Sequence, residues 1–122
     1  MAIMLVADDD AAVRESLAAL VDILGHQCIC AANGKHALMQ AAAAPPDLII
    51  TDARMPLMNG RELLRAVRSD ARLAHIPALV FTSTGEAGVQ EALACGAQKA
   101  LIRPGDPREL VAAIRSPLEY DG

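Results

Sequence analysis

Four short apolar segments of the sequence end on residues whose types can do chemistry. These residues are acids, hydroxyls and one cation, namely Asp8, Asp9 and Asp10 after the first such segment, then Asp52, then Thr82 with Ser83, and finally Arg103. Several carboxylates placed together repel one another and resist ionisation unless a cation balances them. A hard divalent ion with oxygen ligands fits this need, and Mg²⁺ held by one or two carboxylates plus phosphate oxygens is the usual case.

The hydroxyl and the cation indicate that the same place receives an anionic guest. The Arg103 guanidinium matches phosphate geometry, and Thr82 offers a hydroxyl donor. A carboxylate can itself act as a nucleophile and become an aspartyl phosphate. The pattern therefore predicts phosphoryl transfer to one acid beside a metal held by the acids. Leu101 and Ile102 precede Arg103 and are expected to be buried, so the charge that follows them needs a partner.

The elements that must position these residues alternate along the chain. Apolar segments of four or five residues predict strands, and the amphipathic segments between them predict helices. The expected strands are 3–7, 27–31, 47–51, 78–82 and 99–102. The expected helices run from Asp10 to Leu24, from about Lys35 to Ala43, through Leu63 and Val67, from Thr84 to a cap at Gly96, and from Asp106 to near Pro117.

This alternation predicts the fold class and the location of the site. Strands that are apolar on both faces and alternate with helices imply a parallel sheet that is covered on both sides. Five such units are too few for an eightfold barrel, so an open, doubly wound α/β sheet is expected. Functional residues of such sheets gather at the carboxyl ends of the strands, where the acids, Thr82 and Arg103 stand.

Composition limits the class of protein further. The 122 residues are 53% hydrophobic and 21% charged, which favours a single globular domain over 1–122 with no effector domain. A net charge of −4 without a basic run argues against direct binding of nucleic acid. The apolar runs are shorter than the roughly 20 residues of a membrane span, and the start of the chain lacks a signal-peptide pattern, so a cytoplasmic location is expected. Cys28, Cys30 and Cys95 lack metal-ligand spacing and are interpreted as small buried hydrophobes in a reducing compartment.

Four segments together carry a resemblance to a known family. VADDDAAVRE, IITDARMPLMNG, LVFTST and LIRPG resemble the receiver domain of bacterial two-component response regulators, over about residues 3–115. The resemblance implies a flavodoxin-like sheet of five parallel strands in the order 2-1-3-4-5, with five helices. It also implies a phosphorelay role, in which a histidine kinase or phosphotransfer protein donates the phosphoryl group. The domain would not be an enzyme beyond Mg²⁺-dependent self-phosphorylation and self-dephosphorylation.

The resemblance also implies a role for individual residues. Asp52 is the phosphoacceptor, and the metal is held by Asp8, Asp9, Asp52 and the backbone carbonyl of Arg54. Thr82 is the switch hydroxyl and Arg103 binds phosphoryl oxygens. The side chains of Arg54 and Thr84 influence how long the phosphoryl group lasts. The added charge pulls Thr82 inward and repacks the face made by the fourth helix, fifth strand and fifth helix, where a downstream protein or a second copy of the chain is expected to bind.

The segment 100–105 departs from the family pattern at three positions. Arg103 stands where the family normally has lysine, Ala100 where it commonly has an aromatic switch residue, and Gly105 where a large apolar residue is frequent. Arginine keeps the charge but not the shape, so it should reach the pocket and alter its kinetics, pairing with Asp52 at rest. A cis bond between Arg103 and Pro104, which the resemblance implies, would aim the side chain inward. Ala100 predicts weak coupling of Thr82 to the output face, with changes concentrated after the fourth strand.

Two other functions compete with this interpretation. One is a pseudo-receiver, a binding module in which Arg103 pairs permanently with Asp52 and phosphorylation is lost. The other is a phosphatase of the haloacid dehalogenase type, which also forms an aspartyl phosphate. That chemistry requires a second acid two residues after the nucleophile, and this chain has Arg54 there.

Overall fold

The computed structural model contains ten regular elements, which alternate between strand and helix. It describes residues 1–103, 105 and 107–120, and the side chains up to Arg115. The strands are β1 (Ile3–Ala7), β2 (Gln27–Ala31), β3 (Leu48–Asp52), β4 (Ala78–Thr82) and β5 (Lys99–Ile102). The helices are α1 (Ala11–Ile23), α2 (Gly34–Ala43), α3 (Gly60–Ser69), α4 (Gly85–Ala94) and α5 (Pro107–Tyr120).

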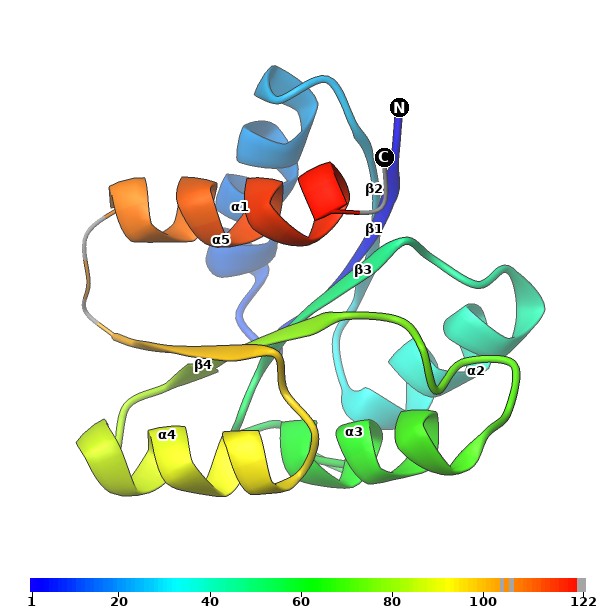
Figure 1. Ribbon diagram of the computed structural model, residues 1–122, viewed down its shortest axis with the longest axis vertical. Coiled ribbons are helices and arrows are strands. Elements are labelled where there is room, and N and C mark those ends of the chain that lie inside the picture. The colour runs from blue at the N-terminus through cyan, green and yellow to red at the C-terminus, as the bar shows by residue number, and fades with distance from the viewer. Residues whose placement is uncertain (104, 106, 121–122) are drawn as a thin grey trace.

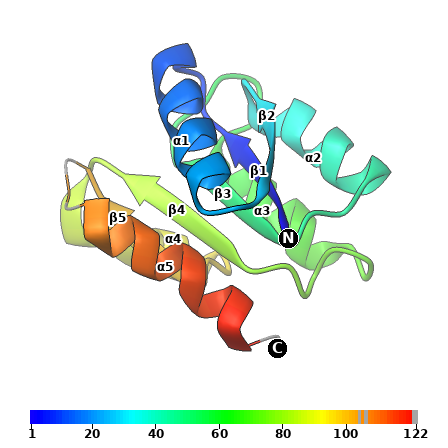
Figure 2. The ribbon, with the colours of Figure 1, turned by 90° about the horizontal axis from the view of Figure 1, so that it is seen from above.

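The strands pair in parallel in the order β2-β1-β3-β4-β5, which confirms the predicted doubly wound, flavodoxin-like sheet. Helices α1 and α5 cover one face of the sheet, and α2, α3 and α4 cover the other, as Figures 1 and 2 show. Because successive side chains on a strand point to opposite faces, β1 serves both layers. Met4 and Val6 pack toward α1 and α5, whereas Leu5 and Ala7 pack toward α2 and α3.

The helix ends follow from local chemistry. The Asp10 side chain accepts the backbone N–H groups of Ala12 and Val13 and so caps α1. Gly25 and Gly96 end α1 and α4 at φ values of 85° and 104°, a backbone region that favours glycine. Sequence reasoning missed the capping box at α3, where Asn59 and Glu62 bond each other's backbone N–H groups.

Two expectations for the end of the chain need correction or lie outside the described residues. Helix α5 was predicted to stop near Pro117, but it continues to Tyr120. A proline in the final turn removes one backbone hydrogen bond while keeping a helical φ, so the helix can continue past it. The expected helix start at Asp106 and the expected cis bond before Pro104 fall outside the described residues.

The expectation that both apolar residues before Arg103 are buried is right for Leu101 and wrong for Ile102. Leu101 is 5% exposed and packs toward α1 and α5, whereas Ile102 is 43% exposed. Strand β5 is an edge strand, and the side chain that alternates with Leu101 at its carboxyl end is left uncovered. Ile102 thus adds apolar surface to the outer edge of the sheet.

The cysteines behave as small apolar residues. Cys28, Cys30 and Cys95 are free and partly buried, which is less burial than expected. The Sγ atoms of Cys28 and Cys30 lie 3.7 Å apart on β2, and burial is the main cause that raises the pKa of Cys28 to about 12. A thiol that stays protonated is a poor nucleophile, so Cys28 is unreactive at neutral pH. None of the described helices is long and apolar enough to cross a membrane.

Arg68 joins three segments behind the sheet through one guanidinium group. Its Nε and Nη2 atoms donate to the carbonyl of Gly96 at 3.0 and 2.8 Å. Its Nη1 atom donates to the carbonyls of Ala74 and Ile76 at 3.1 and 2.6 Å. Partial burial lowers the pKa of Arg68, yet the four bonds hold the end of α3 to the chain before β4 and the turn before β5.

We expect Arg68→Met to lower the free energy of unfolding by about 2–3 kcal/mol, because it leaves carbonyls without their charged donor. Urea denaturation followed by circular dichroism measures this change. Arg65→Met is the matched control, since Arg65 is exposed on the same helix and should change stability by less than about 0.5 kcal/mol. Equal losses of unfolding free energy in the two variants would show that the four hydrogen bonds of Arg68 contribute nothing to stability.

Candidate functional site

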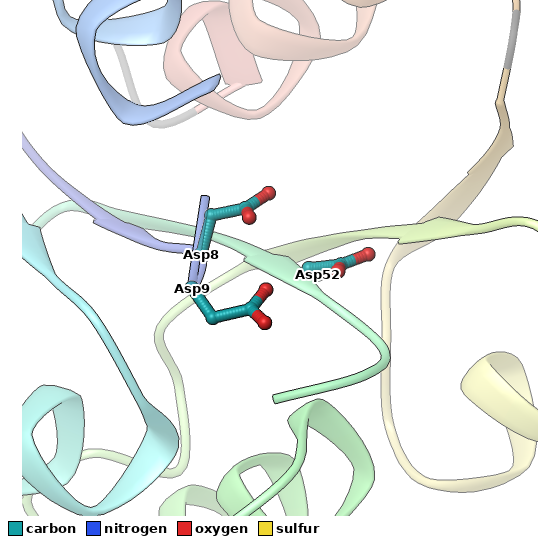
Figure 3. Close-up of side chains that lie close together, drawn as sticks. All are labelled: Asp8, Asp9 and Asp52. Carbon is teal, nitrogen blue, oxygen red and sulfur yellow. The ribbon is translucent and has the colours of Figure 1, made fainter. Parts of the chain in front are cut away.

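Three carboxylates meet at one edge of the sheet. Asp8 and Asp9 follow β1, Asp52 ends β3, and the two strands are hydrogen-bonded neighbours with Ala7 opposite Thr51. One carboxylate oxygen from each acid lies within 4.8 Å of the others. Figure 3 shows the three side chains directed to the same side of the strand ends. The structure thus brings together the acids that the sequence placed at separate strand ends.

The most buried of these acids, Asp8, is held on every side. Its residue is 1% exposed, its Oδ1 accepts the backbone N–H of Asp10 at 2.9 Å, and its Oδ2 accepts Arg103 at 3.2 Å. The Arg14 side chain donates to the Asp8 carbonyl at 2.7 Å. Sequence reasoning missed Arg14, whose only signal is its place one helical turn after the Asp10 cap. These bonds fix the orientation of the Asp8 carboxylate toward Asp52.

Arg103 reaches the acidic cluster, but its expected pairing with Asp52 is wrong. It forms an ion pair with Asp8 instead, and its guanidinium lies 4.0 Å above the centre of the Phe81 ring. The flat guanidinium stacks on an aromatic face, and that contact directs it to the buried carboxylate of Asp8. The pseudo-receiver alternative depended on a pair with Asp52 and loses its structural basis. Phe81 was missed, although it is the single phenylalanine of the chain and directly precedes Thr82.

The pKa of Asp52 is raised above its ordinary value. Burial is the main cause, and the neighbouring carboxylates of Asp8 and Asp9 add to it. The Arg103 charge and a hydrogen bond from the backbone of Ala53 oppose the rise without cancelling it. The single positive charge of Arg103 therefore does not balance the negative charge of the three carboxylates, and this favours binding of a further cation at the site.

The loop after Asp52 lies close against the acceptor strand. The Gly60 N–H donates to the carbonyl of Ala53 at 3.1 Å, and a Cβ at Gly60 would overlap the carbonyl of Asp52. Met58 donates to Pro56 at 2.7 Å across Leu57, which has a φ of 67°. This is the tight and strained three-residue turn that non-glycine residues rarely form. Gly60 thus allows α3 to begin directly beneath the acceptor.

A cavity of about 320 Å³ opens beside Asp52. Asp52 and Arg54 line it from β3 and the following loop, and Thr82 and Thr84 line it from the end of β4. Thr82 is 2% exposed, and its hydroxyl bonds Thr84 rather than any acid. The side chain of Arg54 is exposed at the rim. The predicted switch hydroxyl therefore lies in the same cavity as Asp52 and is bonded there to Thr84.

The position that lacks an aromatic residue lies deeper in the sheet. Ala100 pairs with Val80 in the β4–β5 register and packs, partly buried, against the core beneath α2, α3 and α4. No ring therefore lies between the Thr82 hydroxyl and the outer edge of the sheet at this position.

The fold and the site together define a flavodoxin-like α/β domain with an acidic centre at the carboxyl ends of its strands, which could hold a metal ion. The chain belongs to the response regulator receiver domain family, which residues 4–115 match. This membership supports a role in two-component signalling.

Individual relatives agree with this placement. The chain is 33% identical over 120 residues to the phosphate regulon transcriptional regulatory protein PhoB of Pseudomonas aeruginosa, covering 98% of this chain and 52% of PhoB. The structure is similar to the chemotaxis response regulator CheY4 of Vibrio cholerae, with a TM-score of 0.88, 33% identity and coverage of 96% and 98%. It also resembles a putative response regulator from Chloroflexus aurantiacus, with a TM-score of 0.92, 30% identity and coverage of 97% and 98%. The chain spans about half the length of PhoB and of the ycf27 transcriptional regulators that it matches.

We expect Asp52→Asn to raise the melting temperature at pH 7 in metal-free buffer by about 2–5 °C. Because the folded pKa of Asp52 is raised, its protonated form favours folding at low pH, and this contribution is lost as pH rises through the folded pKa. The advantage of the variant should therefore shrink as pH falls toward about 4, the range of an unfolded aspartate. Thermal melts at both pH values measure the difference.

Asp70→Asn is the control with the opposite sign. The backbone N–H of Arg72 is the main cause that lowers the pKa of Asp70, so its ionised form favours folding at neutral pH. This variant should lower the melting temperature at pH 7. A change of the same sign in both variants would contradict the electrostatic explanation for Asp52.

Proposed function

We propose that this chain is a phosphorylatable receiver that takes a phosphoryl group onto Asp52 from a histidine kinase or histidine phosphotransfer protein, with Mg²⁺ bound. The observation that carries the proposal is the cluster of Asp8, Asp9 and Asp52, whose negative charge Arg103 leaves partly unbalanced. Apart from slow self-phosphorylation and self-dephosphorylation, we propose no enzymatic activity. The phosphoryl group is the signal and Asp52 is its carrier.

The donor set fits a hard divalent ion. Asp8, Asp9 and Asp52 offer carboxylate oxygens, and the backbone carbonyl of Arg54 would complete the protein's share of the ligands. When bound, Mg²⁺ balances the carboxylates and offsets charge on the transferring phosphoryl oxygens. A bound cation would favour the ionised, nucleophilic form of Asp52 and would thereby counteract the rise in its pKa.

The residues of this chain divide the transfer between them. A carboxylate oxygen of Asp52 attacks the phosphorus atom of the phosphohistidine donor, a P–O bond forms, and the P–N bond breaks as the imidazole leaves. The Thr82 hydroxyl and the Arg103 guanidinium can then donate to the phosphoryl oxygens, which requires both to leave their resting partners. The Asp52 carboxylate, which carries one negative charge, becomes an acyl phosphate that carries nearly two, so the transfer adds about one negative charge at the edge of the sheet.

The proposed output is a protein partner at the face made by α4, β5 and α5. Leu93 and Ile102 expose apolar side chains on this face, at 42% and 43%. PhoB is named a transcriptional regulatory protein, and this chain matches about half of it. That this chain itself makes no direct contact with nucleic acid, and that it resides in the cytoplasm, stay predictions.

Beryllofluoride, which stands in for an acyl-phosphate group, tests the proposal directly. With Mg²⁺ present we expect it to shift the backbone NMR signals of wild type around Asp52 and Thr82, and to leave Asp52→Asn unchanged. Asp22→Asn, an exposed acid on α1, is the matched control and should respond as wild type does. No response by wild type, or an equal response by Asp52→Asn, would refute the proposal.

We expect Arg103→Met to bind Mg²⁺ about fivefold more tightly than wild type, because Arg103 occupies an oxygen of Asp8 that the ion needs. The factor corresponds to an ion pair worth about 1 kcal/mol. Arg14→Met is the matched control, since it removes the same charge from beside Asp8 but bonds only the backbone carbonyl. Isothermal titration with Mg²⁺ measures both, and equal affinities in the two variants would contradict a competition at the Asp8 carboxylate.

A further inference from the structure

The hydroxyl of Thr82 is held by one residue, Thr84. The Thr84 backbone N–H donates to the Thr82 Oγ1 at 3.2 Å, and the two hydroxyl oxygens lie 3.0 Å apart. The Thr84 N–H and the Thr84 hydroxyl both contact the Thr82 hydroxyl, which lies next to Gly88 of α4. A Cβ at Gly88, on the first turns of α4, would overlap both hydroxyl oxygens. The resting place of the Thr82 hydroxyl therefore depends on Thr84 to bond it and on Gly88 to leave room.

The start of α4 differs from the other described helix starts for which a cap residue is resolved. Asp10, Asn33 and Asn59 have extended ψ values of 116°, 167° and 175°, and each side chain accepts backbone N–H groups of its helix. Thr84 precedes α4 with φ −104° and ψ 22°, and its side chain makes no capping bond. Its hydroxyl pairs with Thr82 instead, so α4 begins without its cap.

The backbone at this junction is one peptide rotation away from a regular cap. Gly85, the first residue of α4, has a φ of 64°, and a Cβ added to it would point into open space. Moving ψ of Thr84 to an extended value and φ of Gly85 to a helical value changes the two angles by similar amounts in opposite directions. Such paired changes rotate the peptide plane between them and leave the flanking chain in place, as between turn types I and II. After the rotation the Thr84 hydroxyl would stand where an N-cap accepts the N–H of Glu86 or Ala87.

We propose that Thr84 is a positioning residue with two mutually exclusive tasks, which rests on the proposed function of the site. At rest it holds the Thr82 hydroxyl away from Asp52. When Thr82 turns to the phosphoryl group, the hydroxyl of Thr84 loses its partner, the Thr84–Gly85 peptide rotates, and Thr84 caps α4. Phosphorylation is thereby converted into a change at the first turn of α4, on the proposed output face.

This route does not need the aromatic residue that Ala100 replaces. Thr84 lies two residues after Thr82 and directly precedes α4, so a change at Thr82 can reach α4 along the chain without the movement of an aromatic side chain. Gly88 adds a steric part to the same device, because its missing side chain is what lets both hydroxyls occupy the resting position. The change should be largest from Thr82 to α4 and small along α5.

Gly85→Ala tests the peptide rotation in the free protein, without metal or phosphoryl analogue. A side chain at φ 64° disfavours the resting conformation by roughly tenfold, and nothing nearby clashes with it. We expect slower hydrogen exchange at the Glu86 or Ala87 amide, because the cap now bonds it, and about tenfold tighter binding of beryllofluoride with Mg²⁺. Gly25→Ala is the matched control, since Gly25 has a φ of 85° and equally open surroundings at the end of α1.

Thr84→Val and Thr84→Ser separate the role of the hydroxyl from the shape of the side chain. Thr84→Val keeps the branched shape but loses the hydroxyl, so beryllofluoride should bind more tightly while the Glu86 and Ala87 amides gain no protection. Thr84→Ser keeps the hydroxyl and should restore the protection that wild type gains on loading. A merely structural role for Thr84 would move stability in Thr84→Val without this split between binding and protection.

The outcomes for this inference and for the proposed function can be told apart. If wild type does not respond to beryllofluoride, the proposed function fails, while amide exchange in free Gly85→Ala still decides whether the junction rotates. If Gly85→Ala matches Gly25→Ala in amide exchange at α4, the two-task role of Thr84 is overturned even where wild type binds the analogue. Slower exchange at the first turn of α4 in Gly85→Ala alone supports it.

Discussion

Repulsion among carboxylates at the carboxyl ends of β1 and β3 is the constraint on which the rest of the site depends. The pairing of these two central strands brings Asp8, Asp9 and Asp52 together, and partial burial of Asp52 weakens the screening of their charges by water. The result is a raised pKa at Asp52, the residue proposed to accept the phosphoryl group in its ionised form. Because repulsion among the carboxylates destabilises the site without a cation, binding of a divalent ion is favoured. The same repulsion therefore affects both the stability of the domain and its affinity for a metal ion.

The surrounding residues limit that repulsion without abolishing it. Arg103 supplies one positive charge, but the Phe81 ring directs it to Asp8 and leaves Asp52 only partly compensated. Gly60 lets the following helix begin directly beneath the acceptor strand. The Thr82 hydroxyl is bonded to Thr84. At rest, Arg103 and Thr82 thus bond other residues of the chain, namely Asp8 and Thr84.

Much of the fold could be predicted because strands and helices leave periodic patterns in the sequence. The apolar segments 3–7 and 78–82 became strands with the predicted bounds. The errors were local. Ile102 was expected to be buried, but the edge position of β5 leaves it uncovered, and a sequence pattern does not show which strand is at the edge. The continuation of α5 past Pro117 shows that a proline near a helix end need not stop the helix.

The sequence by itself determined which residue types stand at the strand ends, because each follows directly from its place after an apolar segment. It thereby determined that Asp8, Asp9 and Asp52 share one site and that Thr82 and Arg103 border it. Only the tertiary structure decided which of these residues are partners. Arg103 bonds Asp8 rather than Asp52 because the Phe81 ring lies beneath its guanidinium, and Thr82 bonds Thr84 because Gly88 leaves space. Such choices depend on distances between side chains that are remote along the chain, and residue spacing alone does not carry them.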